Sequence, residues 1–83
     1  MTILVTGCAG FIGYHISKRL INKNQVIGID NYNNYYSVQL KKDRIKELKK
    51  IKYNKNFKFY KSNLTDLKSL NLIFKKNKIS KII

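Results

Sequence analysis

The sequence predicts an α/β fold in which a parallel sheet carries helices on both faces. An aliphatic run, Ile3 to Val5, is followed at once by a glycine-spaced turn, and the turn opens a segment with apolar residues at helical spacing. A second apolar run, Gln25 to Asp30, comes after this segment and should pair with the first through a right-handed crossover. Short apolar runs continue to alternate with helical segments, which is typical of a doubly wound sheet.

The turn from Thr6 to Gly13 has the features of a phosphate-binding loop. Gly7 allows a sharp reversal, Gly10 lets the main chain approach a pyrophosphate, and Gly13 lets the helix pack closely. The helix that begins near Phe11 would direct its unsatisfied N–H groups and the positive end of its dipole at the phosphates. The residues expected to hold the diphosphate of a dinucleotide are therefore Gly7, Gly10, Phe11, Ile12 and Gly13.

A carboxylate at the end of the second apolar run completes the expected site. Asp30 lies 23 residues after Gly7 and 17 after Gly13, a spacing at which an acid can accept both ribose hydroxyls of an adenosine. The same charge would repel a 2′-phosphate, and the nearest following base, Lys41, has no arginine adjacent to it. The sequence thus favours NAD over NADP. The alternative is that the three glycines are ordinary loop and packing residues.

The first two helices are expected to pack on the same side of the sheet. The first should run from Phe11 to about Asn22, and Ser37 can cap the second. The apolar positions of the first helix are Phe11, Ile12, Ile16, Leu20 and Ile21. Those of the second are Val38, Ile45, Leu48 and Ile51. The lysines expected to meet water are Lys41, Lys42, Lys46, Lys49 and Lys50.

The second half of the chain predicts two more strands and a third helix. The alternating segment Phe57 to Lys61 should be an edge strand, so that the strand order becomes 3-2-1-4. Thr65 or Asn63 can cap the third helix, which should cover the opposite face of the sheet. Its apolar stripe is Leu67, Leu70, Ile73 and Phe74.

The last residues, Lys78 to Ile83, are interpreted as the first half of a fourth strand. The 83 residues are therefore expected to be the N-terminal part of a Rossmann-type NAD-binding domain, truncated in that strand and without a substrate domain. If they exist alone, the first strand should be left with an unpaired edge.

The formal charge of +14 raises a second class of function, because a strongly basic chain commonly binds nucleic acid or membranes. Lysine supplies 16 of the 18 bases, and these lysines are spread over presumed outward faces. A solvated surface is the favoured interpretation, and a small basic nucleic-acid-binding module is the alternative. A lone cysteine, Cys8, gives no sign of an oxidising compartment, and no signal peptide or membrane-length apolar run is seen. A cytoplasmic protein without a metal site is expected.

These residues resemble the extended short-chain dehydrogenase/reductase superfamily of nucleotide-sugar epimerases and dehydratases, and most closely the N-terminus of UDP-glucuronate 4-epimerases. The segments that carry the resemblance are Ile3-Leu4-Val5-Thr6-Gly7, Gly10-Phe11-Ile12-Gly13, Gly28-Ile29-Asp30-Asn31, Tyr35-Tyr36 and Leu40-Lys41-x-x-Arg44. The resemblance implies NAD as cofactor, a UDP-sugar as substrate and a homodimer for the complete enzyme. A dehydratase or reductase of the same superfamily is the near alternative.

The resemblance also implies that four further residues bind the adenosine part of the cofactor. Asn63 and Leu64 take the place of an Asp followed by Leu or Ile, whose carboxylate and main-chain N–H contact adenine in the family, and the alternative for Asn63 is a helix cap. Asn31 and Asn33 would hydrogen-bond the ribose, with turn formation as the alternative. Epimerisation in the family proceeds by hydride transfer from the sugar C4 to NAD and back, with a tyrosine activated by a lysine four residues later. That pair would lie beyond residue 83. The pair Tyr14 and Lys18 has the same spacing but is interpreted as an ordinary helix contact.

Overall fold

Four parallel strands form one sheet in the computed structural model, which describes residues 1–33 and 37–83. The strands are β1 (Thr2–Thr6), β2 (Gln25–Asp30), β3 (Phe57–Lys61) and β4 (Lys81–Ile82). Their order across the sheet is β3-β2-β1-β4, and each adjacent pair is parallel. The α/β fold and the strand order 3-2-1-4 are therefore confirmed. The predicted segment Tyr35-Tyr36 lies outside the described residues.

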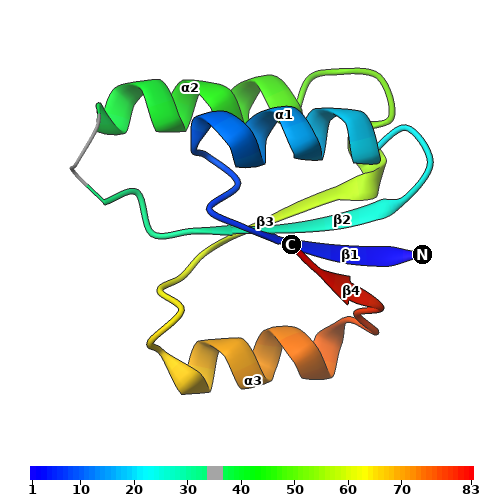
Figure 1. Ribbon diagram of the computed structural model, residues 1–83, viewed down its shortest axis with the longest axis vertical. Helices are drawn as coiled ribbons and strands as arrows, with labels where there is room; N and C mark the ends of the chain where they lie inside the picture. The colour runs from blue at the N-terminus through cyan, green and yellow to red at the C-terminus, as the bar shows by residue number, and fades with distance from the viewer. Residues whose placement is uncertain (34–36) are drawn as a thin grey trace.

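Helices cover both faces of this sheet, as Figure 1 shows. The helices are α1 (Phe11–Leu20), α2 (Val38–Leu48) and α3 (Leu67–Lys76), and a short 3-10 turn, η1 (Asn54–Asn56), precedes β3. α1 and α2 lie side by side on one face, and α3 lies on the other. The crossover to the opposite face is confirmed. Among the described residues, no helix is long and apolar enough to cross a membrane.

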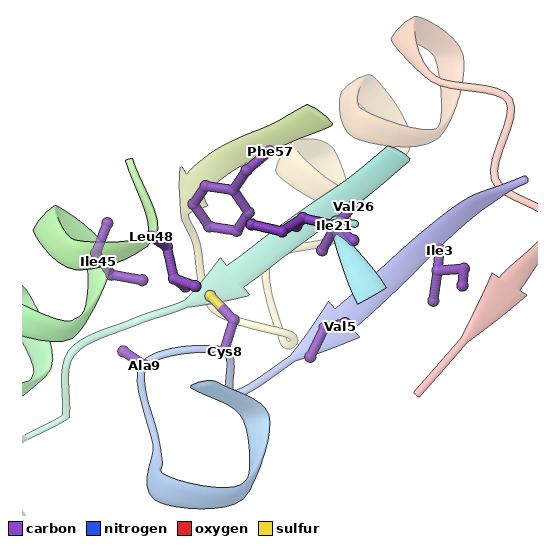
Figure 2. Packing of buried hydrophobic residues seen from close by; sticks show 9 residues of the cluster. All are labelled: Ile3, Val5, Cys8, Ala9, Ile21, Val26, Ile45, Leu48 and Phe57. Atoms are coloured by element: carbon purple, nitrogen blue, oxygen red, sulfur yellow. The ribbon is translucent and has the colours of Figure 1, made fainter. Parts of the chain in front are cut away.

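The larger core lies between the sheet and the α1–α2 layer. Its buried residues are Ile3, Val5, Cys8, Ala9, Ile21, Val26, Ile45, Leu48 and Phe57. Figure 2 shows that strands, the glycine turn and α2 all contribute side chains to it. Cys8 and Ala9 belong to the turn itself, so the turn is anchored in the core by its own side chains.

The apolar face of α1 differs from the prediction. Phe11 and Ile12 are 66% and 71% exposed, whereas Gly13, Ser17 and Ile21 face the sheet. The reason is that α1 packs closely against the glycine turn at Gly13, and residues four and eight positions further lie on the same, buried side of the helix. The two exposed apolar side chains stand at the start of the helix, where they are free to line a cavity.

The α3 layer is thinner than the sequence predicts. Ile73 is buried and Leu70 packs beside it, but Leu67 and Phe74 are 71% and 42% exposed. The expected cap is also wrong, because Asp66 and not Thr65 or Asn63 caps α3. The Oδ1 of Asp66 accepts from the Ser69 main-chain N–H at 3.3 Å, and its Oδ2 accepts from the Ser69 hydroxyl at 2.8 Å.

The first strand has no open edge, contrary to the expectation for an isolated chain. Ile3 pairs with Lys81 and Leu4 pairs with Ile82, so β4 lies directly beside β1. Beyond the strand, the Thr6 main-chain N–H and its hydroxyl both donate to the carbonyl oxygen of Ile83 at 2.9 Å. The short β4, together with Ser80 and Ile83 on either side of it, therefore hydrogen-bonds to the main chain of β1 on that side.

Candidate functional site

The turn between β1 and α1 has a shape that only glycine permits. Gly7 has a φ of +63°, in the left-handed region, and its carbonyl oxygen accepts from the Gly10 N–H at 3.0 Å. A Cβ on Gly13 would overlap the carbonyl oxygen of Gly7, while one on Gly10 would lie 3.2 Å from the same atom. Gly7 and Gly13 are thus required by the compact turn itself, whereas a side chain at Gly10 would only crowd it, and Gly13 packs against the turn more than against the strand.

The first turn of α1 presents its main-chain N–H groups without a side-chain cap. Gly10 is the N-cap residue, and in the described part of the chain no side chain hydrogen-bonds to this end of the helix. The first turn also contains no acidic residue. Uncapped N–H groups and the helix dipole together favour an anion at this position.

The Asp30 carboxylate at the end of β2 faces the glycine turn. It is 7% exposed, its Oδ2 accepts from the Ala9 N–H at 3.0 Å, and its Oδ1 accepts from the Tyr32 N–H at 2.8 Å. β1 and β2 pair in parallel from Thr2↔Gln25 to Thr6↔Ile29, which brings the two strand ends together. Each carboxylate oxygen can accept a further hydrogen bond, so Asp30 can hold a ligand as well as the turn.

The residues after β2 form a second polar segment, held by a lysine that the sequence places in water. The Asn33 N–H donates to the Asn31 Oδ1 at 3.0 Å, and the Lys41 Nζ donates to both the carbonyl oxygen and the Oδ1 of Asn33, at 3.1 and 2.7 Å. Lys41 is only 6% exposed. The prediction of a solvated Lys41 is therefore wrong. Lys41, Ile45 and Leu48 recur at i, i+4 and i+7 and share the inward face of α2.

The other four lysines predicted to meet water do so; they are Lys42, Lys46, Lys49 and Lys50. A second base of α2, Arg44, instead reaches back to the glycine turn. Its Nη1 donates to the carbonyl oxygen of Ala9 at 3.1 Å, and its guanidinium lies 5.9 Å from the centre of the Phe11 ring. Lys41 and Arg44 are not among the site residues that the sequence predicts. The motif Leu40-Lys41-x-x-Arg44, which carries part of the resemblance, was the feature that could have indicated them.

The segment after β3 supplies the third side of the site. The Asn63 Oδ1 accepts from the Thr65 N–H at 3.0 Å, which forms a tight turn ahead of α3. Leu64, the next residue, is 53% exposed. Because the carboxyl ends of β1, β2 and β3 lie at one edge of the sheet, this segment stands beside the glycine turn and Asp30.

These segments enclose a cavity of about 810 Å³ at the carboxyl edge of the sheet. All ten residues predicted to bind the cofactor line it, namely Gly7, Gly10, Phe11, Ile12, Gly13, Asp30, Asn31, Asn33, Asn63 and Leu64. Lys41, Arg44 and Ile83 line it as well. A volume of this size suits a small organic ligand, and its walls combine apolar side chains with a few convergent polar groups.

Three residues with reactive side chains, Cys8, Tyr14 and Lys18, do not line this cavity. Burial, and then the nearby Asp30 carboxylate, raise the pKa of the Cys8 thiol far above its usual range, so the thiol stays protonated inside the core. Tyr14 and Lys18 contact each other along α1, with the Lys18 Nζ 5.9 Å from the centre of the Tyr14 ring. This is an ordinary contact between neighbouring helical turns.

A family model and several known proteins match this chain over most of its length. The family model described as GDP-mannose 4,6 dehydratase matches residues 4–83. The chain is 48% identical over 75 residues to Protein CapI of Staphylococcus aureus, which covers 89% of this chain and 21% of that protein. It is 44% identical over 81 residues to the UDP-glucuronate 4-epimerase of Thermodesulfobacterium geofontis, covering 96% of this chain and 24% of the relative.

A solved structure shares the fold. The crystal structure of UDP-glucuronic acid 4-epimerase from Bacillus cereus, in complex with UDP-glucuronic acid and NAD, superimposes with a TM-score of 0.77 at 32% identity. The match covers 100% of this chain and 25% of that one. The chain thus spans about a quarter or less of the length of these relatives.

Proposed function

The chain belongs to the GDP-mannose 4,6 dehydratase family, and we propose that it binds the adenosine diphosphate part of NAD within a nucleotide-sugar 4-epimerase. The observation that carries the proposal is that Asp30 is hydrogen-bonded to the glycine turn and lines the same cavity as the turn. A diphosphate fits the start of α1, because its first turn has no side-chain cap and no acidic residue and so leaves main-chain N–H groups for an anion. The Asp30 carboxylate accepts the ribose hydroxyls.

The remaining cavity residues fit the other parts of the same ligand. Asn31 and Asn33 offer polar atoms beside the ribose, and Asn63 with Leu64 offers an amide and an apolar surface to the adenine. When bound, NAD supplies a hydride acceptor and donor. The residues of this chain bind and orient the adenosine diphosphate end of NAD. They do not supply the catalytic tyrosine and lysine that the resemblance requires, because Tyr14 and Lys18 form an ordinary helix contact instead.

For the whole protein we propose the interconversion of UDP-glucuronate and UDP-galacturonate through transient oxidation at C4. Support comes from the names of the relatives, which are UDP-glucuronate 4-epimerases in Thermodesulfobacterium geofontis and Bacillus cereus. A 4,6-dehydratase or reductase of the same superfamily remains the second candidate, since the family model carries a dehydratase description. The homodimeric state and the cytoplasmic location stay predictions.

The test is a calorimetric titration of the folded chain with NAD, NADP and a DNA oligonucleotide at moderate salt. We expect NAD to bind more tightly than NADP, and the oligonucleotide to bind weakly with a steep salt dependence. Asp30→Asn should weaken NAD binding by about tenfold and reduce the preference over NADP, because a charged hydrogen-bond acceptor is lost. The matched control is Asp43→Asn, an exposed carboxylate on α2 that lies outside the cavity.

Two outcomes would contradict the proposal. One is a folded chain, verified by circular dichroism, that binds the oligonucleotide more tightly than NAD. The other is equal weakening of NAD binding by Asp30→Asn and Asp43→Asn, since that result would reflect net charge and not a ribose contact.

A further inference from the structure

Lys41 is a cation that the fold buries at the rim of the cavity. Only 6% of it is exposed, and its ammonium donates to the carbonyl oxygen and to the Oδ1 of Asn33 at 3.1 and 2.7 Å. Burial of a lysine is costly unless its N–H groups are hydrogen-bonded. Two hydrogen bonds to one neutral residue indicate that this cation holds Asn33 in place, because their geometry fixes both the main chain and the side chain of that residue.

Asn33 is the last described residue of a short segment that Asp30 begins. At its start, the Tyr32 N–H donates to the Asp30 Oδ1 at 2.8 Å. Within the segment, the Asn33 N–H donates to the Asn31 Oδ1 at 3.0 Å. The segment is therefore fixed by Asp30 at one end and by Lys41 at the other, and Asp30, Asn31, Asn33 and Lys41 all line the cavity.

We propose that Lys41 is a positioning residue for the ribose end of the cavity. By holding Asn33, it keeps Asp30 and Asn31 in the arrangement that receives the ribose hydroxyls, and so it acts through these residues on the ligand. The inference rests on the proposed binding of an adenosine nucleotide. It adds the residue that sets the preference of the site for a ribose over a deoxyribose. Such preference depends on placing an acceptor to within a few tenths of an ångström of the hydroxyl.

Two simpler roles predict different behaviour. If Lys41 only attracted the diphosphate by its charge, or only stabilised the fold, its loss would weaken the binding of ADP and of 2′-deoxy-ADP by the same factor. If Lys41 positions the ribose acceptors, its loss weakens ADP more, because the 2′-hydroxyl is the one group that these two nucleotides do not share. The ratio of the two affinities therefore separates positioning from charge and stability.

The experiment titrates the chain and three variants with ADP and with 2′-deoxy-ADP. We expect the unmodified chain to prefer ADP by about tenfold, the value of one charge-assisted hydrogen bond. Lys41→Met should lower this preference to about threefold or less, and Lys41→Arg, which keeps N–H donors, should restore most of it. Lys42→Met is the matched control, since Lys42 is the exposed neighbour with the same charge, and it should leave the preference unchanged.

Asn33→Ala gives an independent route if Lys41→Met does not fold, because it removes the Oδ1 acceptor and should lower the preference in the same way. An unchanged preference in Lys41→Met or in Asn33→Ala overturns the inference. Equal binding of both nucleotides by the unmodified chain also overturns it while leaving nucleotide binding intact. A folded chain that binds neither nucleotide overturns the proposed function and the inference together.

Discussion

On one face of the sheet, nine buried residues from β1, β2, β3, α2, the glycine turn and the residue that follows α1 form one cluster. On the other face, the cluster has four buried residues among those described, and α3 contributes only Ile73. Leu67 and Leu72 of α3 are 71% and 57% exposed. The glycine turn, α1 and α2 all belong to the denser side, whereas Asn63 and Leu64 lead into the sparser one. The walls proposed for the diphosphate and ribose are therefore better supported than the wall proposed for the adenine.

The largest loss of stability should come from Gly13→Ala, in the denser layer. The new Cβ would overlap the Gly7 carbonyl oxygen, and the main chain of the turn has to move to relieve that overlap. We expect a loss of about 4 kcal/mol in the free energy of unfolding, measured by urea denaturation. Gly10→Ala is the control in the same turn, where the new atom would lie 3.2 Å from the same oxygen. A loss as large for Gly10→Ala would contradict this account.

The next test truncates one buried residue on each face. Leu48→Ala should lower the free energy of unfolding by about 3 kcal/mol, because Leu48 is fully enclosed between α2 and the sheet. Ile73→Ala should cost about 2 kcal/mol, since the neighbouring part of α3 is exposed and can close over the space left behind. An equal or greater loss for Ile73→Ala would mean that the two layers are equally well packed.

The smallest effect concerns the cap of α3 and its dependence on pH. Hydrogen bonds from the Ser69 hydroxyl and main-chain N–H lower the pKa of Asp66 below its usual 3.8. The stability that this ionised cap contributes is therefore fully present above pH 3.8 and is lost as the pH falls through the lower pKa of the folded state. Asp66→Ala should lower the melting temperature slightly at neutral pH, and the difference from the unmodified chain should shrink in acid. A difference that stays constant with pH would argue against the cap.

The fold and most of the site follow from local sequence rules. The spacing of Gly7, Gly10 and Gly13 specifies the turn, and the crossover rule places β2 beside β1, so that Asp30 must face the turn. Helical spacing was less reliable for single side chains. It predicts Phe11 on the inward face of the first helix and Lys41 on the outward face of the second, yet Phe11 is 66% exposed and Lys41 only 6%.

What the sequence could not supply was the contact between α2 and the turn. The Arg44 contact with the Ala9 carbonyl oxygen joins residues 35 positions apart, and it depends on where the second helix comes to rest on the first. Likewise, the exposure of Leu67 and Phe74 depends on the tilt of α3 against the sheet, which apolar periodicity does not specify.

The double hydrogen bonding of Asp30 has a thermodynamic consequence for any ligand. One carboxylate restrains Ala9 of the turn and Tyr32 of the following segment before a nucleotide arrives, so folding has already removed conformational entropy that binding would otherwise have to remove. The cavity is in this sense preorganised. Its affinity depends on how firmly that side chain is tethered as well as on the charge that it carries.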